Sequence, residues 1–187
     1  MHHKRPDLSC WRPAQTKAER LAERTPLSGT APLFTTRACS EPVAAQFPIR
    51  AWTDGATAGT NPGPCAYGAL ILFHGKRHEI GAFLGPGTNN IAEYRGMIAV
   101  LAWLVEHAPR ERALIRTDAQ LVAYRLNGTW KKKHSDHPHI QALINEARGL
   151  MHVLPHVRIE WVPREQNTAA DEIASRYLER KLEPLWL

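Results

Sequence analysis

The chain has 187 residues and a mass of 21.0 kDa, a length that fits one ordinary domain with a tail better than two domains. Hydrophobic residues make up 43% and charged residues 22%, which is enough apolar side chain for a core and excludes a globally disordered or collagen-like chain. The net charge of +6 and the pI near 9.5 favour nucleic acid as the partner class, with a solvated basic surface as the alternative.

The sequence predicts neither a disulfide framework nor a targeting segment. Its three cysteines form an odd number without a CxxC spacing, which favours a reducing compartment. The apolar run Ile98–Val105 is far too short to span a bilayer. The first residues lack the apolar core of a secretory signal, and Glu19 and Glu23 are atypical of a transit peptide. We therefore expect a cytoplasmic protein without a membrane partner.

Residues 1–47 differ in composition from the rest of the chain. They are rich in Pro, Thr, Ser and Arg, and only the stretch Pro13–Arg24 has a helical periodicity. We predict a mostly disordered tail over 1–47 and one α/β domain over 48–187. Docking of Trp11 and the helix-like stretch on a partner is the alternative for the tail.

Three strands are expected at the start of the domain. Ile49–Asp54 alternates between apolar and polar residues and then meets Gly55, as a strand that enters a turn would. Tyr67–His74 and His78–Leu84 are two further strand-like runs, and the short connection between them predicts an antiparallel meander.

Helices and strands then alternate along the chain. Apolar residues recur at spacings of four and three from Ile91 to Leu104, which predicts a helix that ends near Pro109. The remaining expected elements are a buried strand at Ala113–Asp118, helices at Ala119–Leu126 and Pro138–Leu154, a strand at Val157–Trp161 and a helix at Thr168–Leu182. This order indicates an α/β domain whose sheet mixes antiparallel and parallel pairs.

Four acids lie where these expected elements end or begin. Asp54 and Asp118 end strands, whereas Glu93 and Asp171 lie in the opening turns of helices. Ligand sites of open α/β sheets gather at strand ends and nearby helix N-termini, so the four carboxylates are candidates to converge. Clustered carboxylates need cations, and a hard divalent ion such as Mg²⁺ fits oxygen ligands best. The alternative is that each acid is a separate solvated cap or turn residue.

Short motifs surround the four acids. The first acid lies in Thr-Asp-Gly-Ala at 53–56, which is followed by Asn-Pro-Gly-Pro at 61–64 and Tyr-Gly-Ala at 67–69. The other three lie in Thr-Asn-Asn-Ile-Ala-Glu-Tyr at 88–94, Arg-Thr-Asp-Ala-Gln at 116–120 and Asn-Thr-Ala-Ala-Asp at 167–171. In this order the motifs resemble those of the type 1 ribonuclease H family over residues 48–180. The resemblance implies a ribonuclease H-like fold, a five-stranded mixed sheet flanked by helices.

The resemblance also implies an activity, the hydrolysis of the RNA strand of RNA/DNA hybrids by an endonuclease with two Mg²⁺ ions, for which Mn²⁺ is a substitute. Asp54 would bridge both ions, and Asp171 would help to hold the one that activates water. Glu93 and Asp118 would hold the other. Such a pair of ions stabilises the attacking and leaving oxygens at phosphorus. The expected partner is a hybrid duplex bound by a monomer, without a small-molecule cofactor.

Contacts with the substrate follow from the same resemblance and from a basic loop. Glu93 and the backbone near Gly55 would read ribose 2′-hydroxyls, and Thr88 with Asn90 would seat a DNA phosphate. The lysine run 131–133 is the best local phosphate contact, with a plain solvated loop as the alternative. The full set of expected substrate-binding residues is Gly55, Thr88, Asn90, Gln120, Trp130, Lys131, Lys132, Lys133, Arg164 and Asn167.

The sequence departs from the family pattern in two places. Many members carry a histidine after the fifth strand, where this chain reads Trp-Val-Pro-Arg-Glu-Gln-Asn at 161–167, as archaeal and some bacterial members do. Arg164 could take over the contact with a phosphate or product, or it could pair with Glu165 or solvent. Ala119 replaces a serine that commonly follows the third acid.

Two other functions compete with the hybrid-specific endonuclease. The fold also serves nucleases with other nucleic-acid substrates, but the Thr-Asn-Asn at 88–90 favours the hybrid-specific branch. A catalytically inactive nucleic-acid binding module is the third hypothesis. The presence of all four acids argues against it, because an inactive copy is free to lose them.

Overall fold

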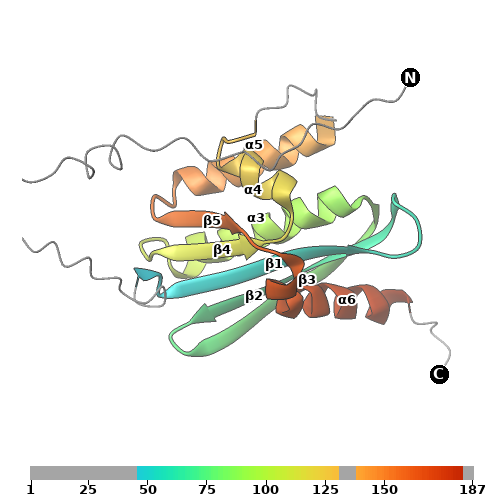
Figure 1. The fold of residues 1–187 in the computed structure, drawn as a ribbon, viewed down its shortest axis with the longest axis horizontal. Helices are drawn as coiled ribbons and strands as arrows, with labels where there is room; N and C mark the ends of the chain where they lie inside the picture. Colours follow the sequence, from blue (N-terminus) through green and yellow to red (C-terminus); the bar gives the residue numbers. More distant parts are fainter. Residues whose placement is uncertain (1–45, 131–137, 183–187) are drawn as a thin grey trace, which may run out of the picture. The chain divides into compact units, whose positions relative to one another are not determined.

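The computed structural model describes residues 46–130 and 138–182 of the 187-residue chain (Figure 1). The elements in chain order are β1 (Ile49–Thr57), β2 (Gly63–Phe73), β3 (Lys76–Gly87), α3 (Asn89–His107), β4 (Ala113–Thr117), α4 (Gln120–Leu126), α5 (Pro138–His152), β5 (Val157–Trp161), the 3-10 helix η1 (Arg164–Gln166) and α6 (Thr168–Leu182). The predicted order of strands and helices is confirmed, and η1 is the one addition among the described residues.

The five strands form one mixed sheet in the order β3-β2-β1-β4-β5. β1 pairs antiparallel with β2, and β2 pairs antiparallel with β3, which confirms the predicted meander. β4 pairs parallel with both β1 and β5. Because β1 and β4 are parallel neighbours, their carboxyl ends lie at the same edge of the sheet, and this places residues far apart in sequence side by side.

The β2–β3 connection is a tight two-residue turn. Phe73 pairs with Lys76, and the residues between them, His74 and Gly75, have φ values of 49° and 73°. Positive φ at both central positions is typical of the hairpin turns whose twist matches that of the strands. β3 therefore begins at Lys76, two residues before the predicted start.

β1 does not end at Gly55, where the sequence analysis placed a turn. The strand continues to Thr57, and Gly55 pairs with Tyr67 of β2. A Cβ on Gly55 would lie 2.5 Å from the backbone nitrogen of Glu93 and 2.9 Å from the Cβ of Ala92. The predicted turn was therefore wrong. A glycine is needed at this position because α3 approaches the strand closely.

Helices cover both faces of the sheet (Figure 1). α3, α4 and α5 lie on one face, where the main core forms around β1 residues Ile49 and Ala51 and helix residues such as Leu101 and Leu104, all fully buried. α6 packs on β1, β2 and β3 from the other face. Burying each large aliphatic side chain contributes about 1.5–3 kcal/mol. Alternation along β1 turns Asp54 toward the α6 face.

The predicted tail, 1–47, lies outside the described residues except for Gln46 and Phe47. Phe47 is buried, and the guanidinium of Arg112 lies 5.1 Å from the centre of its ring. The folded part of the chain therefore includes Phe47. The rest of the predicted division into a tail and a domain stays a prediction. None of the described helices has the length and apolar character that crossing a bilayer requires.

Candidate active site

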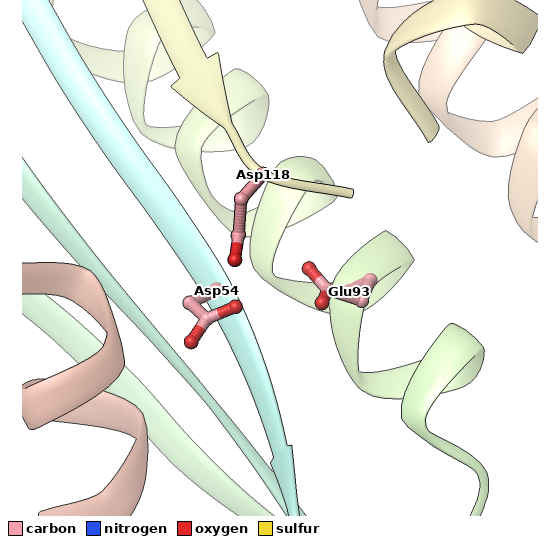
Figure 2. A group of neighbouring side chains, drawn as sticks. All are labelled: Asp54, Glu93 and Asp118. Atoms are coloured by element: carbon pink, nitrogen blue, oxygen red, sulfur yellow. The ribbon is translucent and has the colours of Figure 1, made fainter. Parts of the chain in front are cut away.

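Three carboxylates meet at the carboxyl ends of β1 and β4, one from β1, one from α3 and one from the residue that follows β4 (Figure 2). Trp52 of β1 pairs with Arg116 of β4, so Asp54 and Asp118 follow two residues further along the two parallel chains. Glu93 comes from the second turn of α3, because that helix begins at Asn89. Glu93 was expected in the opening turn and lies one residue beyond it. One oxygen of each carboxylate lies within 4.8 Å of the others.

Helix capping fixes where Glu93 lies. The Thr88 hydroxyl oxygen accepts a hydrogen bond of 3.3 Å from the Ile91 N–H, so Thr88 is the N-cap of α3. The Asn89 side-chain amide donates to Glu93 Oε1 at 3.4 Å, whereas Glu93 Oε2 is buried and has no hydrogen-bond partner in the described structure. The cap and the close contact at Gly55 together hold this carboxylate against β1.

Burial and mutual repulsion make the charged form of two of these carboxyl groups unfavourable. Burial, the neighbouring charge of Asp118 and a hydrogen bond with Asp171 raise the pKa of Asp54 from 3.8 to about 8. Burial, followed by the charges of Asp54 and Asp118, raises the pKa of Glu93 well above its usual value. Without a cation, the folded site therefore retains protons that these groups would lose in water.

Asp118 is fixed by contacts on both its side chain and its backbone. The side-chain amide of Asn167 donates to Asp118 Oδ1 at 2.7 Å and to the Thr53 carbonyl at 3.1 Å. The indole N–H of Trp161 donates to the Asp118 carbonyl at 3.1 Å. Asn167 is almost fully buried, so it ties the end of β4 to β1 and to the start of α6.

The fourth acid, Asp171, lies in the first turn of α6. It contributes to the raised pKa of Asp54, and its Oδ1 accepts a hydrogen bond of 2.9 Å from Arg164 Nη2. Arg164 therefore contacts Asp171, a partner that neither sequence-based alternative for this residue named. The side chain of Arg164 remains 74% exposed.

A cleft of about 550 Å³ opens over the acids. Its walls include all four acids and five further residues of interest, Gly55, Asn89, Asn90, Gln120 and Arg164. The structure thus brings four of the expected substrate-binding residues to one cavity with the acids. Whether they contact a substrate stays a prediction.

The other expected substrate contacts lie elsewhere. Thr88 borders a neighbouring cavity that Asn90 shares. Trp130 lies beyond α4, with the guanidinium of Arg125 5.6 Å from its ring centre. Asn167 is buried behind Asp118 and positions that residue. Lys131, Lys132 and Lys133 lie outside the described residues.

The sequence analysis missed three supporting contacts. The sequence indicated Asn89 only as part of a motif, and Trp161 only as the end of a strand and the first residue of the 161–167 segment. The amide of Asn167 was assigned to the substrate and not to Asp118. The position of a polar residue in a turn near an acid could have indicated such a contact. Its hydrogen-bond partner could not be predicted, because it depends on elements that meet only in the folded chain.

Comparison with known proteins identifies the family. The model of the reverse transcriptase-like family matches residues 53–177. Ribonuclease HI of Halobacterium salinarum is 35% identical over 133 residues, which cover 70% of this chain and 64% of that protein. The chain belongs to the type 1 ribonuclease H family. The bifunctional protein Rv2228c of Mycobacterium tuberculosis is 38% identical over 125 residues, covering 65% of this chain but only 33% of that longer relative.

Solved structures of this ribonuclease H family share the fold. The N-terminal RNase H domain of Rv2228c from Mycobacterium tuberculosis has a TM-score of 0.65 at 34% identity and covers 72% of this chain and 96% of that one. LC11-RNase H1 in complex with an RNA/DNA hybrid has a TM-score of 0.64 at 28% identity, with coverages of 72% and 99%. The predicted five-stranded ribonuclease H-like fold is confirmed.

Proposed function

We propose that this chain is a divalent-metal-dependent endonuclease that hydrolyses the RNA strand of RNA/DNA hybrids. The observation that carries the proposal is the convergence of the Asp54, Glu93 and Asp118 carboxylates in an open cleft. Membership in the ribonuclease H family supports the reaction type, and the hybrid bound to LC11-RNase H1 supports the substrate class.

The residues present fit a divalent cation. The donor set is made only of carboxylate oxygens, which suits a hard ion such as Mg²⁺ or Mn²⁺. Glu93 Oε2 is buried without a partner, and such an atom is costly unless a ligand satisfies it. The raised pKa values of Asp54 and Glu93 also support a cation site, since a cation would offset the repulsion that causes part of the shift.

The chain's own side chains would carry out the positioning. Asp54, Glu93 and Asp118 would hold the first ion, and Asp171 would take part in holding a second one beside Asp54. Divalent ions bound there supply positive charge to the attacking and leaving oxygens of the scissile phosphodiester. Asn167 keeps Asp118 Oδ1 in place, and Asn89 keeps Glu93 Oε1 in place, so little reorganisation would accompany the reaction.

The RNA strand would be selected at the part of the cleft that Glu93 and Gly55 line. Glu93 and the backbone beside Gly55 border the cavity, where a hydrogen-bonding group can meet a ribose 2′-hydroxyl that DNA lacks. Asn90 and Gln120 line the cleft and would contact the duplex. Arg164 would contact a phosphate, since no histidine precedes α6 in the 161–167 segment.

Three labelled duplexes test the proposal. RNA/DNA, RNA/RNA and DNA/DNA substrates are incubated with the protein in Mg²⁺, Mn²⁺ or EDTA, and products are separated on a denaturing gel. We expect internal cleavage of the RNA strand of the hybrid with either metal and none in EDTA. Preferential cleavage of DNA/DNA would favour another nuclease of this fold. Binding without cleavage under all conditions would contradict the proposed activity.

A further inference from the structure

Asp171 differs from the other three acids in its electrostatic surroundings. The group of carboxylates whose oxygens lie within 4.8 Å of one another comprises Asp54, Glu93 and Asp118, and does not include Asp171. Among the ion pairs of the described residues, Asp171 is the one acid of the site that a cationic side chain holds, at 2.9 Å from Arg164 Nη2. The cleft thus contains three carboxylates without an ion pair among the described residues and one that is paired with a cationic side chain.

Arg164 is placed to interact with the whole acidic cluster. It begins η1, only seven residues before Asp171, and its guanidinium feels the charges of Asp171, Asp54 and Asp118, in that order of strength, which raise its pKa. No other arginine or lysine lines the cleft among the described residues. Because its side chain is 74% exposed, Arg164 is free to leave Asp171 without disturbing the core.

We propose that Arg164 is a competing counter-ion: it occupies Asp171 in the metal-free protein and lowers the affinity of this carboxylate for a divalent cation, so that the two ions bind with unequal affinity. This inference rests on the proposed function, because it assumes a second ion beside Asp171. Among the described residues, the carboxylates of Asp54, Glu93 and Asp118 make no ion pair with a cationic side chain, and they define the tighter position.

The competition has a consequence for the substrate. A phosphate group offers the guanidinium of Arg164 a strong alternative partner, since planar N–H donors match phosphate oxygens. Transfer of Arg164 from Asp171 to an incoming phosphate would free the carboxylate when the duplex arrives. Ion occupancy at Asp171 and substrate binding would then favour each other.

Direct measurement of metal binding tests the proposal without relying on cleavage. Full-length protein is titrated with Mn²⁺ in low salt, by calorimetry and by the electron paramagnetic resonance signal of free Mn²⁺. The variants are Arg164→Gln and, as a matched control, Arg176→Gln. Arg176 also lies on the α6 side, and it pairs with Glu79 at 3.0 Å, so its replacement removes the same charge away from the cleft. Circular dichroism checks that both variants are folded.

We expect one tighter and one weaker Mn²⁺ in the wild type. Arg164→Gln should raise the affinity for the weaker ion by about tenfold or more, because one nearby charge has an effect of this size at short range. It should change the affinity for the tighter ion by less than about threefold. Arg176→Gln should leave the affinities for both ions within about threefold of the wild-type values. Equal affinities in the wild type, or the same shift in both variants, would overturn the inference while leaving the proposed function intact. Absence of Mn²⁺ binding in all three proteins would overturn both.

Discussion

At the scale of single residues, the site depends on hydrogen-bond donors that hold Asp118 and Glu93 in place. Asp118 has the amide of Asn167 on its side chain and the indole of Trp161 on its carbonyl. Glu93 has the amide of Asn89. Donors fixed in this way set the direction of a carboxylate before any cation arrives, which is the general requirement for a precise metal site.

Asp118→Asn tests the role of one carboxylate. The change keeps the shape but removes a negative charge from the cluster, so metal affinity should fall while the fold survives. We expect cleavage of the hybrid to fall by at least about a hundredfold. Hybrid binding should persist, because the expected phosphate contacts lie on other residues. Cleavage gels, electrophoretic shift and circular dichroism in one Mg²⁺ buffer measure the three quantities, and near-normal cleavage by a folded variant would remove Asp118 from the active site.

Asn167→Ala tests a positioning residue. Its loss leaves the buried Thr53 carbonyl without this donor and frees Asp118, which should lower the free energy of unfolding by about 1–3 kcal/mol. We expect kcat to fall more than KM rises, because the residue is buried and acts through Asp118. Asn145→Ala, on the exposed face of α5, is the control and should leave the kinetics unchanged and the free energy of unfolding within about 0.5 kcal/mol. A variant with a raised KM and an unchanged kcat would instead place Asn167 at the substrate.

At the scale of elements, the contact between β1 and the start of α3 decides whether the site assembles. The fully buried Ala92 and the backbone of Glu93 pack directly on Gly55. No side chain fits between the strand and the helix at this point. The distance between the backbone of Glu93 and that of β1 is therefore set by direct packing of the helix on the strand.

Gly55→Ala should separate these two elements. The added Cβ would lie 2.5 Å from the Glu93 nitrogen, so we expect a loss of about 1–3 kcal/mol in the free energy of unfolding and weaker metal binding. Gly149→Ala in α5 is the matched control. Nothing lies within 4 Å of its added Cβ, and it should stabilise the protein by about 0.5–1 kcal/mol through helix propensity. Chemical denaturation measures both, and equal effects of the two substitutions would show that the close approach is unimportant.

These same contacts separate what the sequence could predict from what it could not. Periodicity predicted the strands and helices because it reflects which face each element buries, and four acids at element ends predicted where the site lies. The extension of β1 past Gly55 and the pairing of Arg164 with Asp171 were not predicted. Both depend on the position of a second element in space, and a glycine or an exposed arginine has the same local pattern in a turn as in a close contact.

At the scale of the whole molecule, the acidic site reduces the stability of the metal-free protein near neutral pH. Burial raises the pKa of Asp54 to about 8, above its unfolded value of 3.8. Between these values the folded state binds more protons than the unfolded state, so the free energy of unfolding falls as pH rises. The stabilising contribution of the protonated group is complete below about pH 4 and is lost by about pH 8.

Thermal unfolding in EDTA at several pH values measures this effect. We expect the Tm of the wild type to fall between pH 5 and pH 8 relative to that of Asp54→Asn, which has no charge to form at this position. Mg²⁺ should reverse most of the fall in the wild type, because an ion that binds the folded state stabilises it. Parallel curves for the two proteins in EDTA would show that Asp54 titrates as it does in water.

Removal of the N-terminal segment tests whether the residues before Phe47 are needed for folding or for cleavage. All motifs lie after residue 47, so a truncation to residues 47–187 should fold and cleave within about tenfold of the full chain, a barrier difference of about 1.4 kcal/mol. A second truncation to 49–187 is the control. It also removes Phe47, which is buried beneath Arg112, and should lower the free energy of unfolding by about 1.5–3 kcal/mol. Denaturation curves and initial rates on the hybrid distinguish the two effects. If the 47–187 protein is as stable as the full chain but loses more than tenfold in rate, the segment before Phe47 takes part in binding the substrate.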